Sequence, residues 1–214
     1  DLKDVWRQYY GNANYTLPMT DDQSLNFDFN IYRTNDTGAA KAGDISNTTW
    51  SLAAAYSFLT AHTITLAYQK VHGDTPFDYV AFGNNGAGDT GDSIFLANSI
   101  QYSDFNGPGE KSWQARYDLN MASYGVPGLS FMVRYVNGSD IDGSHLPSNS
   151  TYSGYGDDGK HHETNLEAKY VVQSGPAKDL SLRMRQAWHT ANGDQPDGDA
   201  KEFRLIADYP INVF

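Results

Sequence analysis

The sequence predicts an all-β fold, an antiparallel up-and-down transmembrane β-barrel. Three observations predict this class. Side-chain character alternates with a period of two residues, short and long connections alternate along the chain, and the apolar face of most predicted strands is rich in aromatic residues. Side chains two apart on a strand share a face, so strict alternation indicates two different environments. We therefore expect about nine strands, with apolar faces toward lipid and polar faces toward water.

The alternation is clear in eight segments, taken here in chain order. In the first, Leu25, Phe27, Phe29 and Ile31 form one face, and Asn26, Asp28 and Asn30 form the other. The remaining segments repeat this division between an apolar and a polar series. The eight segments are 24–32, 51–58, 62–70, 112–121, 129–136, 165–172, 179–188 and 201–209.

Segment 179–188 shows why a water-filled interior is needed. Leu180, Leu182 and Met184 share one face, whereas Arg183 and Arg185 share the other. Two adjacent cations in a dry core would each cost several kcal/mol, but in a hydrated channel they cost little. The segment therefore favours lipid on its apolar side and an aqueous lumen on its charged side.

The connections between the segments differ in length in a regular way. Short turns are expected at 19–23, 59–61, 125–128 and 174–178, and long polar loops at 35–46, 73–110, 139–162 and 192–199. In an antiparallel meander this order places all tight turns at one end and all long loops at the other. Outer-membrane barrels have this outline, with short periplasmic turns and long external loops.

Composition excludes several classes of protein. The net charge of -11 makes nucleic acid an unsuitable partner, and the absence of cysteine excludes disulfides and thiolate metal sites. No apolar run reaches the roughly 18 residues of a transmembrane helix. The mean hydropathy of -0.59 is still compatible with a barrel, because alternating strands keep the average low. The 15 tyrosines suit a boundary between apolar and aqueous surroundings.

Two other classes of function remain open at this level. A soluble secreted β-sandwich, such as a carbohydrate-binding module, would also show alternating strands, with its aromatic residues forming a sugar platform. A barrel-shaped outer-membrane enzyme would need a catalytic cluster, and the sequence contains no catalytic signature. Dependence on detergent would separate the barrel from the sandwich.

Long stretches of the chain resemble the OprD-type family of substrate-specific outer-membrane porins of pseudomonads. The resemblance is carried by residues 43–58, 66–77, 91–138, 165–188 and 202–214, so it covers essentially the whole chain. It implies an eighteen-stranded barrel in the outer membrane of a Gram-negative bacterium, without enzymatic activity. The final strand of the family ends at the carboxyl terminus, often in an aromatic residue, as Phe214 is here.

The resemblance extends only to the last nine strands of such a barrel. Residues 1–214 are thus expected to form a single domain, the carboxyl-terminal half of a porin. Single-chain bacterial barrels have even strand numbers, and an open half-barrel would leave unpaired strand edges in lipid. We therefore expect a fragment or one part of a split chain, whose missing amino-terminal half comes from elsewhere.

The family resemblance also implies a ladder of basic residues that guides carboxylates through the lumen. Fixed cations in a low-dielectric passage concentrate anions, and arginine can hold a carboxylate in two hydrogen bonds. The alternative is that these cations only neutralise Asp118, Glu167, Glu202 and Asp208 across the wall. The matching positions are Arg116, Arg134, Lys169, Arg183, Arg185 and Arg204.

The resemblance further implies that loop 73–110 folds inward and forms a constriction. Its apolar stretches, 77–82 and 93–105, are unusual for a solvated external loop and favour packing inside a barrel. The candidate constriction contacts are Tyr79, Tyr102 and Asp104, with Asp92 a weaker one. An acid opposite the basic ladder would suit zwitterions, although loop packing alone would explain the same residues.

Other motifs carry little functional weight. The glycine-rich 86–91 matches a dinucleotide-binding pattern but lacks the strand before it and the helix after it, so no cofactor is expected. Residues 160–163, Lys-His-His-Glu, offer metal ligands, but neighbours on a strand face opposite ways, and a hydrated loop end is expected. The aspartate-rich 193–199 is expected to be a solvated loop rather than a calcium site.

Overall fold

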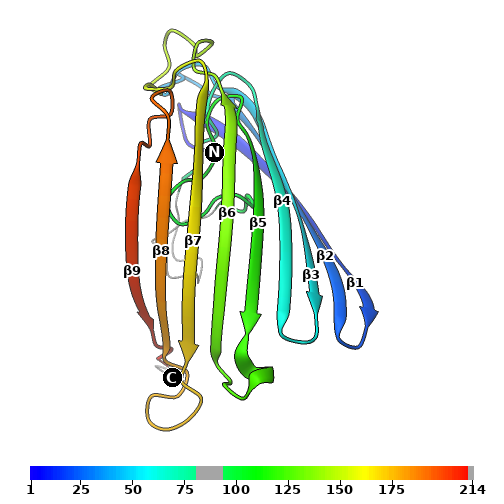
Figure 1. The fold of residues 1–214 in the computed structure, drawn as a ribbon. Coiled ribbons are helices and arrows are strands. Elements are labelled where there is room, and N and C mark those ends of the chain that lie inside the picture. Colours follow the sequence, from blue (N-terminus) through cyan, green and yellow to red (C-terminus); the bar gives the residue numbers. More distant parts are fainter. Residues whose placement is uncertain (81–93, 212–214) are drawn as a thin grey trace.

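The computed structural model describes residues 1–80 and 94–211, and within them nine antiparallel strands form a single curved sheet (Figure 1). The strand order is the sequence order, so each strand pairs with its neighbours along the chain. The strands are β1 (Trp6–Thr20), β2 (Gln23–Asp36), β3 (Ser46–Phe58), β4 (His62–His72), β5 (Lys111–Asn120), β6 (Leu129–Ile141), β7 (Gly159–Val171), β8 (Ser181–Ala191) and β9 (Ala200–Asp208).

The two ends of the sheet differ as the sequence predicts. The short turns lie together at one end and the long connections at the other (Figure 1). Between β5 and β6 the chain forms a 3-10 turn, η1 (Met121–Tyr124), which Gly125 ends in the left-handed region at φ 83°. No helix in residues 1–80 or 94–211 has the length and apolar character needed to cross a membrane.

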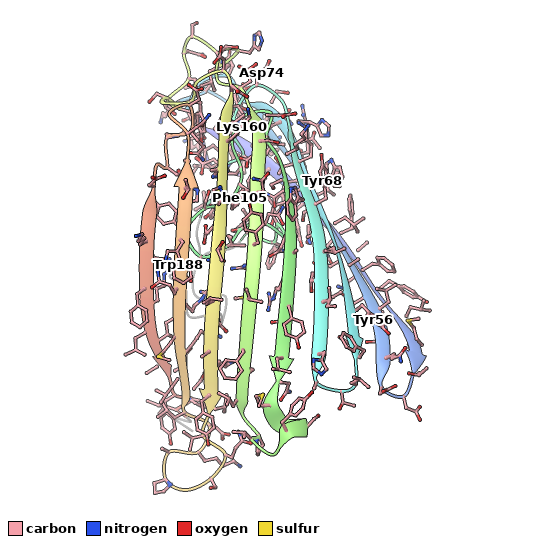
Figure 2. All side chains as sticks on the ribbon, viewed as in Figure 1. Tyr56, Tyr68, Asp74, Phe105, Lys160 and Trp188 are labelled. Atoms are coloured by element: carbon pink, nitrogen blue, oxygen red, sulfur yellow. The ribbon has the colours of Figure 1, made fainter. Side chains whose placement is uncertain are left out.

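The outer face of the sheet is apolar and exposed. Leu66, Met184 and Leu205 expose 60%, 51% and 70% of their surface, and Tyr68 and Trp188 project from the same side (Figure 2). Side chains of this size rarely form so extended an apolar surface in a soluble monomer, so the exposure indicates contact with lipid. With strands of 9 to 15 residues, each is long enough to cross a bilayer at a tilt.

The inner face is polar, and much of it is buried. Gln69, Glu163 and Asn165 are 0% exposed and Gln114 is 4% exposed, although all four are strand residues. This is the reverse of a soluble domain, in which polar residues face water and apolar residues fill the core. The structure confirms both faces in each of the eight segments and the expected antiparallel up-and-down order of the strands.

A long connection covers this inner face. The described parts of the segment between β4 and β5 pass behind β5 to β8 in Figure 1, where they bury the polar side chains. Phe77 and Leu96 of this segment pack with Tyr32 and Val71 of the wall in a small apolar cluster. The inner face is therefore buried by the protein's own loop and not by a second sheet.

Some expectations need correction. The β-sandwich alternative is not supported, because the described strands form one sheet with a lipid-type outer face. The loop expected at 139–162 is shorter, since β6 continues to Ile141 and β7 begins at Gly159. Residues 160–163 thus belong to a strand, and the expectation of a hydrated loop end there is wrong. Strand β9 ends at Asp208, and Phe214 lies outside the described residues.

Candidate functional site

Six cationic side chains gather on the inner face of five adjacent strands. They occupy three successive rows of the sheet, and we call them the basic patch. In one row Arg116 is paired with Arg134, and in the next Arg185 is paired with Arg204. In the third, Lys169 is paired with Arg183. The strands β5 to β9 thus bring together the six positions Arg116, Arg134, Lys169, Arg183, Arg185 and Arg204.

Three carboxylates pair with members of the basic patch. Asp118 accepts two hydrogen bonds from Arg116, at 2.7 Å from Nε and 2.6 Å from Nη2. Glu167 lies 3.7 Å from Nε of Arg183 and 3.2 Å from Nε of Arg185.

The third carboxylate, Glu202, lies 2.9 Å from Nε of Arg204. Among residues 1–80 and 94–211, the recorded carboxylate partners of the basic patch are thus Asp118, Glu167 and Glu202. The sequence-level alternative, neutralisation across the wall, holds in part for these three acids, but the structure records no such pair for Asp208 among the described residues.

Arg134 is almost fully buried, as is Arg185, but its recorded side-chain hydrogen bond goes to a neutral amide. It exposes 7% of its surface, and its Nε donates to Oδ1 of Asn165 at 2.9 Å. Its Nη2 has no hydrogen-bond partner among the described residues. A buried cation with an unsatisfied N–H group is costly, so this guanidinium has unused capacity to bind an acceptor.

Inner-face side chains fix the long connection by bonding to its main chain. Gln69 donates to the carbonyl oxygens of Asp104 and Phe105 at 3.0 and 2.8 Å and accepts from the amide of Asn98. Gln114 donates to the carbonyl of Ala97 at 3.1 Å. These bonds hold residues 97–105 of the connection against β4 and β5.

Glu163 fixes the same connection from the far side. Its carboxylate accepts the main-chain N–H groups of Tyr102 and Ser103 at 3.1 and 2.9 Å and also bonds to Asn165. The basic patch joins this arrangement, because Arg204 donates to the carbonyl of Gln101 at 2.8 Å. Sequence reasoning missed Gln69, Gln114 and Glu163. These residues could have been found from the sequence, because they occupy inward-facing positions of their strands and the loop is apolar enough to pack against them.

Two of the predicted constriction residues meet each other. The hydroxyl of Tyr79 donates to Oδ2 of Asp104 at 2.9 Å, and Ser99 donates to the other oxygen of that carboxylate. Tyr79 and Asp104 come from opposite ends of the connection, so their bond joins its two described parts. Asp92 and the glycine-rich 86–91 lie outside the described residues.

Tyr102 lies apart from that pair. Its ring packs on His189 with centroids 4.9 Å apart, and its hydroxyl donates to the carbonyl of Asp197 at 3.0 Å. Burial raises the pKa of the Tyr102 phenol, and the carboxylates of Asp197 and Glu202 add to the rise. The phenol therefore stays protonated at neutral pH and acts as a donor toward the β8–β9 loop.

The chain is similar in sequence to known outer membrane porins. A family model described as "outer membrane porin, OprD family" matches residues 1–213. Porin D of Pseudomonas aeruginosa is 76% identical over 216 residues, covering 100% of this chain and 48% of that protein.

The fold is also similar to that of solved porin structures. The improved crystal structure of Pseudomonas aeruginosa OprD superposes with a TM-score of 0.92 at 74% identity, covering 100% of this chain and 56% of that one. Pseudomonas aeruginosa OccD3 (OpdP) gives 0.87 at 42% identity, covering 100% of this chain and 52% of that one. The chain thus spans about half the length of these relatives.

Proposed function

Because the chain belongs to the OprD family of outer membrane porins, we propose that it forms one wall of a pore for small carboxylate-bearing solutes, such as amino acids or aromatic and other organic acids. The basic patch is the observation that carries this proposal. Its six cations lie on the inner face, in three neighbouring rows. This concentration of positive charge would attract an anionic group.

The arrangement suits passage better than tight capture. Fixed cations within a low-dielectric wall raise the local concentration of anions. Several neighbouring sites that each bind weakly allow a solute to move from one to the next and to leave. The carboxylates of Asp118, Glu167 and Glu202 weaken each site, since a solute must compete with them for the same guanidinium groups.

The connection between β4 and β5 is proposed as the constriction. Its described parts lie over the inner face, where Tyr79 bonds to Asp104 and Arg204 of the basic patch bonds to the main chain of Gln101. A carboxylate on the loop facing a basic wall would orient a solute that has a positive and a negative end. Tyr102, whose hydroxyl bonds to the β8–β9 loop, would act nearer the outer opening.

Pore formation requires strands beyond those described. Among the described residues β1 pairs with β2 alone and β9 with β8 alone, so each has one unpaired edge. Unpaired backbone groups cost several kcal/mol each in hydrocarbon. We therefore propose that further strands, from a longer chain or a second one, complete the barrel in the outer membrane.

The test is ion selectivity in planar bilayers, measured on the full-length product of the gene that encodes this chain. Replacing both Arg183 and Arg185 by glutamine should shift the reversal potential toward cations and reduce the block of current by small carboxylates. The matched control replaces Arg7 and Arg33, which are exposed on the outer side near the loops. Equal selectivity and equal block in both double variants would contradict the proposal.

A further inference from the structure

Two histidines from neighbouring strands meet on the inner face, between the basic patch and the end of the sheet that carries the long connections. His161 of β7 and His189 of β8 are each 2% exposed, and Nδ1 of His161 lies 2.8 Å from Nε2 of His189. Phe105 stacks on the first ring with centroids 4.2 Å apart. Packing therefore fixes the two rings with one nitrogen of each facing the other.

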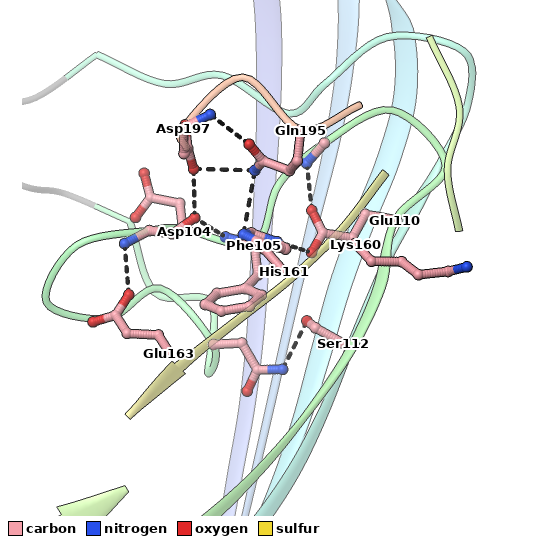
Figure 3. Close-up of polar contacts among 12 residues, drawn as sticks. Asp104, Phe105, Glu110, Ser112, Lys160, His161, Glu163, Gln195 and Asp197 are labelled. Atoms are coloured by element: carbon pink, nitrogen blue, oxygen red, sulfur yellow. Dashed lines mark hydrogen bonds and ion pairs between the residues drawn. The ribbon is translucent and has the colours of Figure 1, made fainter. Parts of the chain in front are cut away.

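In each ring, the nitrogen that points away from the other histidine must carry a proton. Nε2 of His161 lies 2.7 Å from a carboxylate oxygen of Glu110, and both side chains are fully buried (Figure 3). Nδ1 of His189 lies 2.7 Å from the carbonyl oxygen of Gly198. Carboxylate and carbonyl oxygens only accept hydrogen bonds, so both of these nitrogens are donors.

The two nitrogens that face each other, Nδ1 of His161 and Nε2 of His189, therefore carry lone pairs when both rings are neutral. Gln195 supports this for His161, because its Nε2 donates to Nδ1 at 3.2 Å. The orientation of that amide is fixed, since its Oε1 accepts the main-chain N–H of Asp197. Two lone pairs at 2.8 Å repel each other unless a positive species lies between or beside them.

A carboxylate lies beside the two lone pairs. Asp197 accepts from Gln195 at 3.1 Å (Figure 3). It also accepts from the hydroxyl of Ser103 at 2.9 Å. One ligand atom from each of His161, His189 and Asp197 lies within 4.8 Å of the others. Two imidazole nitrogens and one carboxylate oxygen form a donor set that binds zinc and leaves a coordination position open.

We propose that His161, His189 and Asp197 bind a divalent transition-metal ion, with Zn²⁺ the best match to the donor set. The surroundings have the outer-shell contacts that such sites use, since each imidazole donates its other N–H to a fixed oxygen. Zinc–nitrogen distances of about 2.0–2.1 Å require the nitrogens to separate to roughly 3.3 Å, which a small ring rotation supplies.

The ion would connect parts of the chain that are distant in sequence. His161 and His189 belong to the wall, Asp197 to the β8–β9 loop, and Glu110 to the end of the long connection. A bound ion would therefore hold both loops against β7 and β8 at the end of the sheet that carries the long connections. This assignment does not depend on the solute that the pore carries.

The test uses the full-length protein in detergent, stripped with a chelator and titrated with Zn²⁺ by calorimetry. Replacing His189 by glutamine should weaken binding by more than the ~10- to 100-fold that outer-shell changes cause. Glu110→Gln should weaken it within that range. The control is His162→Gln, because His162 lies next in sequence but on the opposite face of β7.

Cobalt gives a second readout that does not depend on the variants. Co²⁺ should produce visible absorption bands of a four- or five-coordinate nitrogen–oxygen site, and Asp197→Asn should alter them. Heat-dependent migration on gels checks that each variant is folded. Zn²⁺ affinity equal in the parent and in folded His189→Gln would overturn the proposal, as would an octahedral, aqueous-type Co²⁺ spectrum. In either case a proton shared by the two rings would be the remaining explanation.

Discussion

Arg116 and Arg134 are direct cross-strand partners in the ladder between β5 and β6. Like charges in this position repel each other. Asp118 offsets the first through two hydrogen bonds, whereas Arg134 donates to a neutral amide, that of Asn165. The sheet therefore maintains positive charge that its own carboxylates only partly balance.

Removing the carboxylate of Asp118 should increase the preference of the pore for anions. In Asp118→Asn the guanidinium of Arg116 loses its counter-ion, so the potential along the wall becomes more positive. The measurement is the reversal potential across a bilayer with a salt gradient, repeated at two ionic strengths because screening reduces the effect. Asp21→Asn, in the exposed β1–β2 turn, is the control. A shift toward cations would contradict the prediction.

Replacing Glu163 by glutamine should release the loop that it holds. The buried carboxylate accepts the N–H groups of Tyr102 and Ser103, and an amide can accept them only with its single oxygen. Opening of residues 101–104 should become easier by about 1–3 kcal/mol. Hydrogen exchange of these amides measures this directly. Glu167→Gln, on the same face of the same strand, should leave their exchange unchanged; equal acceleration in both variants would refute a local role.

The Tyr79–Asp104 bond should steady the two described parts of the long connection. Tyr79→Phe removes one hydrogen bond, with an expected local loss of about 0.5–1.5 kcal/mol. If this connection narrows the pore, single-channel recordings should show more current noise and altered conductance. Tyr15→Phe, on the exposed outer face, provides the control. Identical recordings from the two variants would argue against a constriction at this bond.

A charge on the outer face should destabilise the protein far more than one on the inner face. Met184 is the fourth of the eleven residues of β8 and exposes 51% of its surface, so Met184→Arg should cost up to about 2–4 kcal/mol in a bilayer. The control, Thr63→Arg, places the same side chain on the inner face of β4, directly across from Asp118. Equilibrium unfolding in guanidinium with phospholipid vesicles measures both. Equal costs would contradict the assignment of the faces.

The strands and their faces could be predicted because a period of two is a local property. Eight segments show it clearly, and the structure confirms the division into faces in each. Strand β1 was harder to recognise, because the adjacent tyrosines Tyr9 and Tyr10, followed by Gly11, obscure the alternation at its start. Its pairing with β2 determines the strand more strongly than its own sequence does.

The contacts within the site depend on register, which a period does not supply. His161 and His189 are 28 residues apart, and only the pairing of β7 with β8 brings them together. The motif at 160–163 carried little weight as a metal site because neighbours on a strand face opposite ways, whereas the residues that meet come from two strands and a loop. Likewise the family resemblance pointed to Tyr102 as a constriction contact, but it could not show which part of the wall Tyr102 meets, and its hydroxyl bonds to the β8–β9 loop.

The meander described above has a consequence for how the protein folds. Since each strand pairs with its sequence neighbours, every hairpin can form from local contacts, and the sheet can grow by adding one hairpin at a time. Loop closure is inexpensive for such steps, which favours rapid assembly despite the all-β architecture. In the completed barrel proposed above, the slow event would be the pairing of β1 and β9 with the further strands, because those partners are remote and must be found by search.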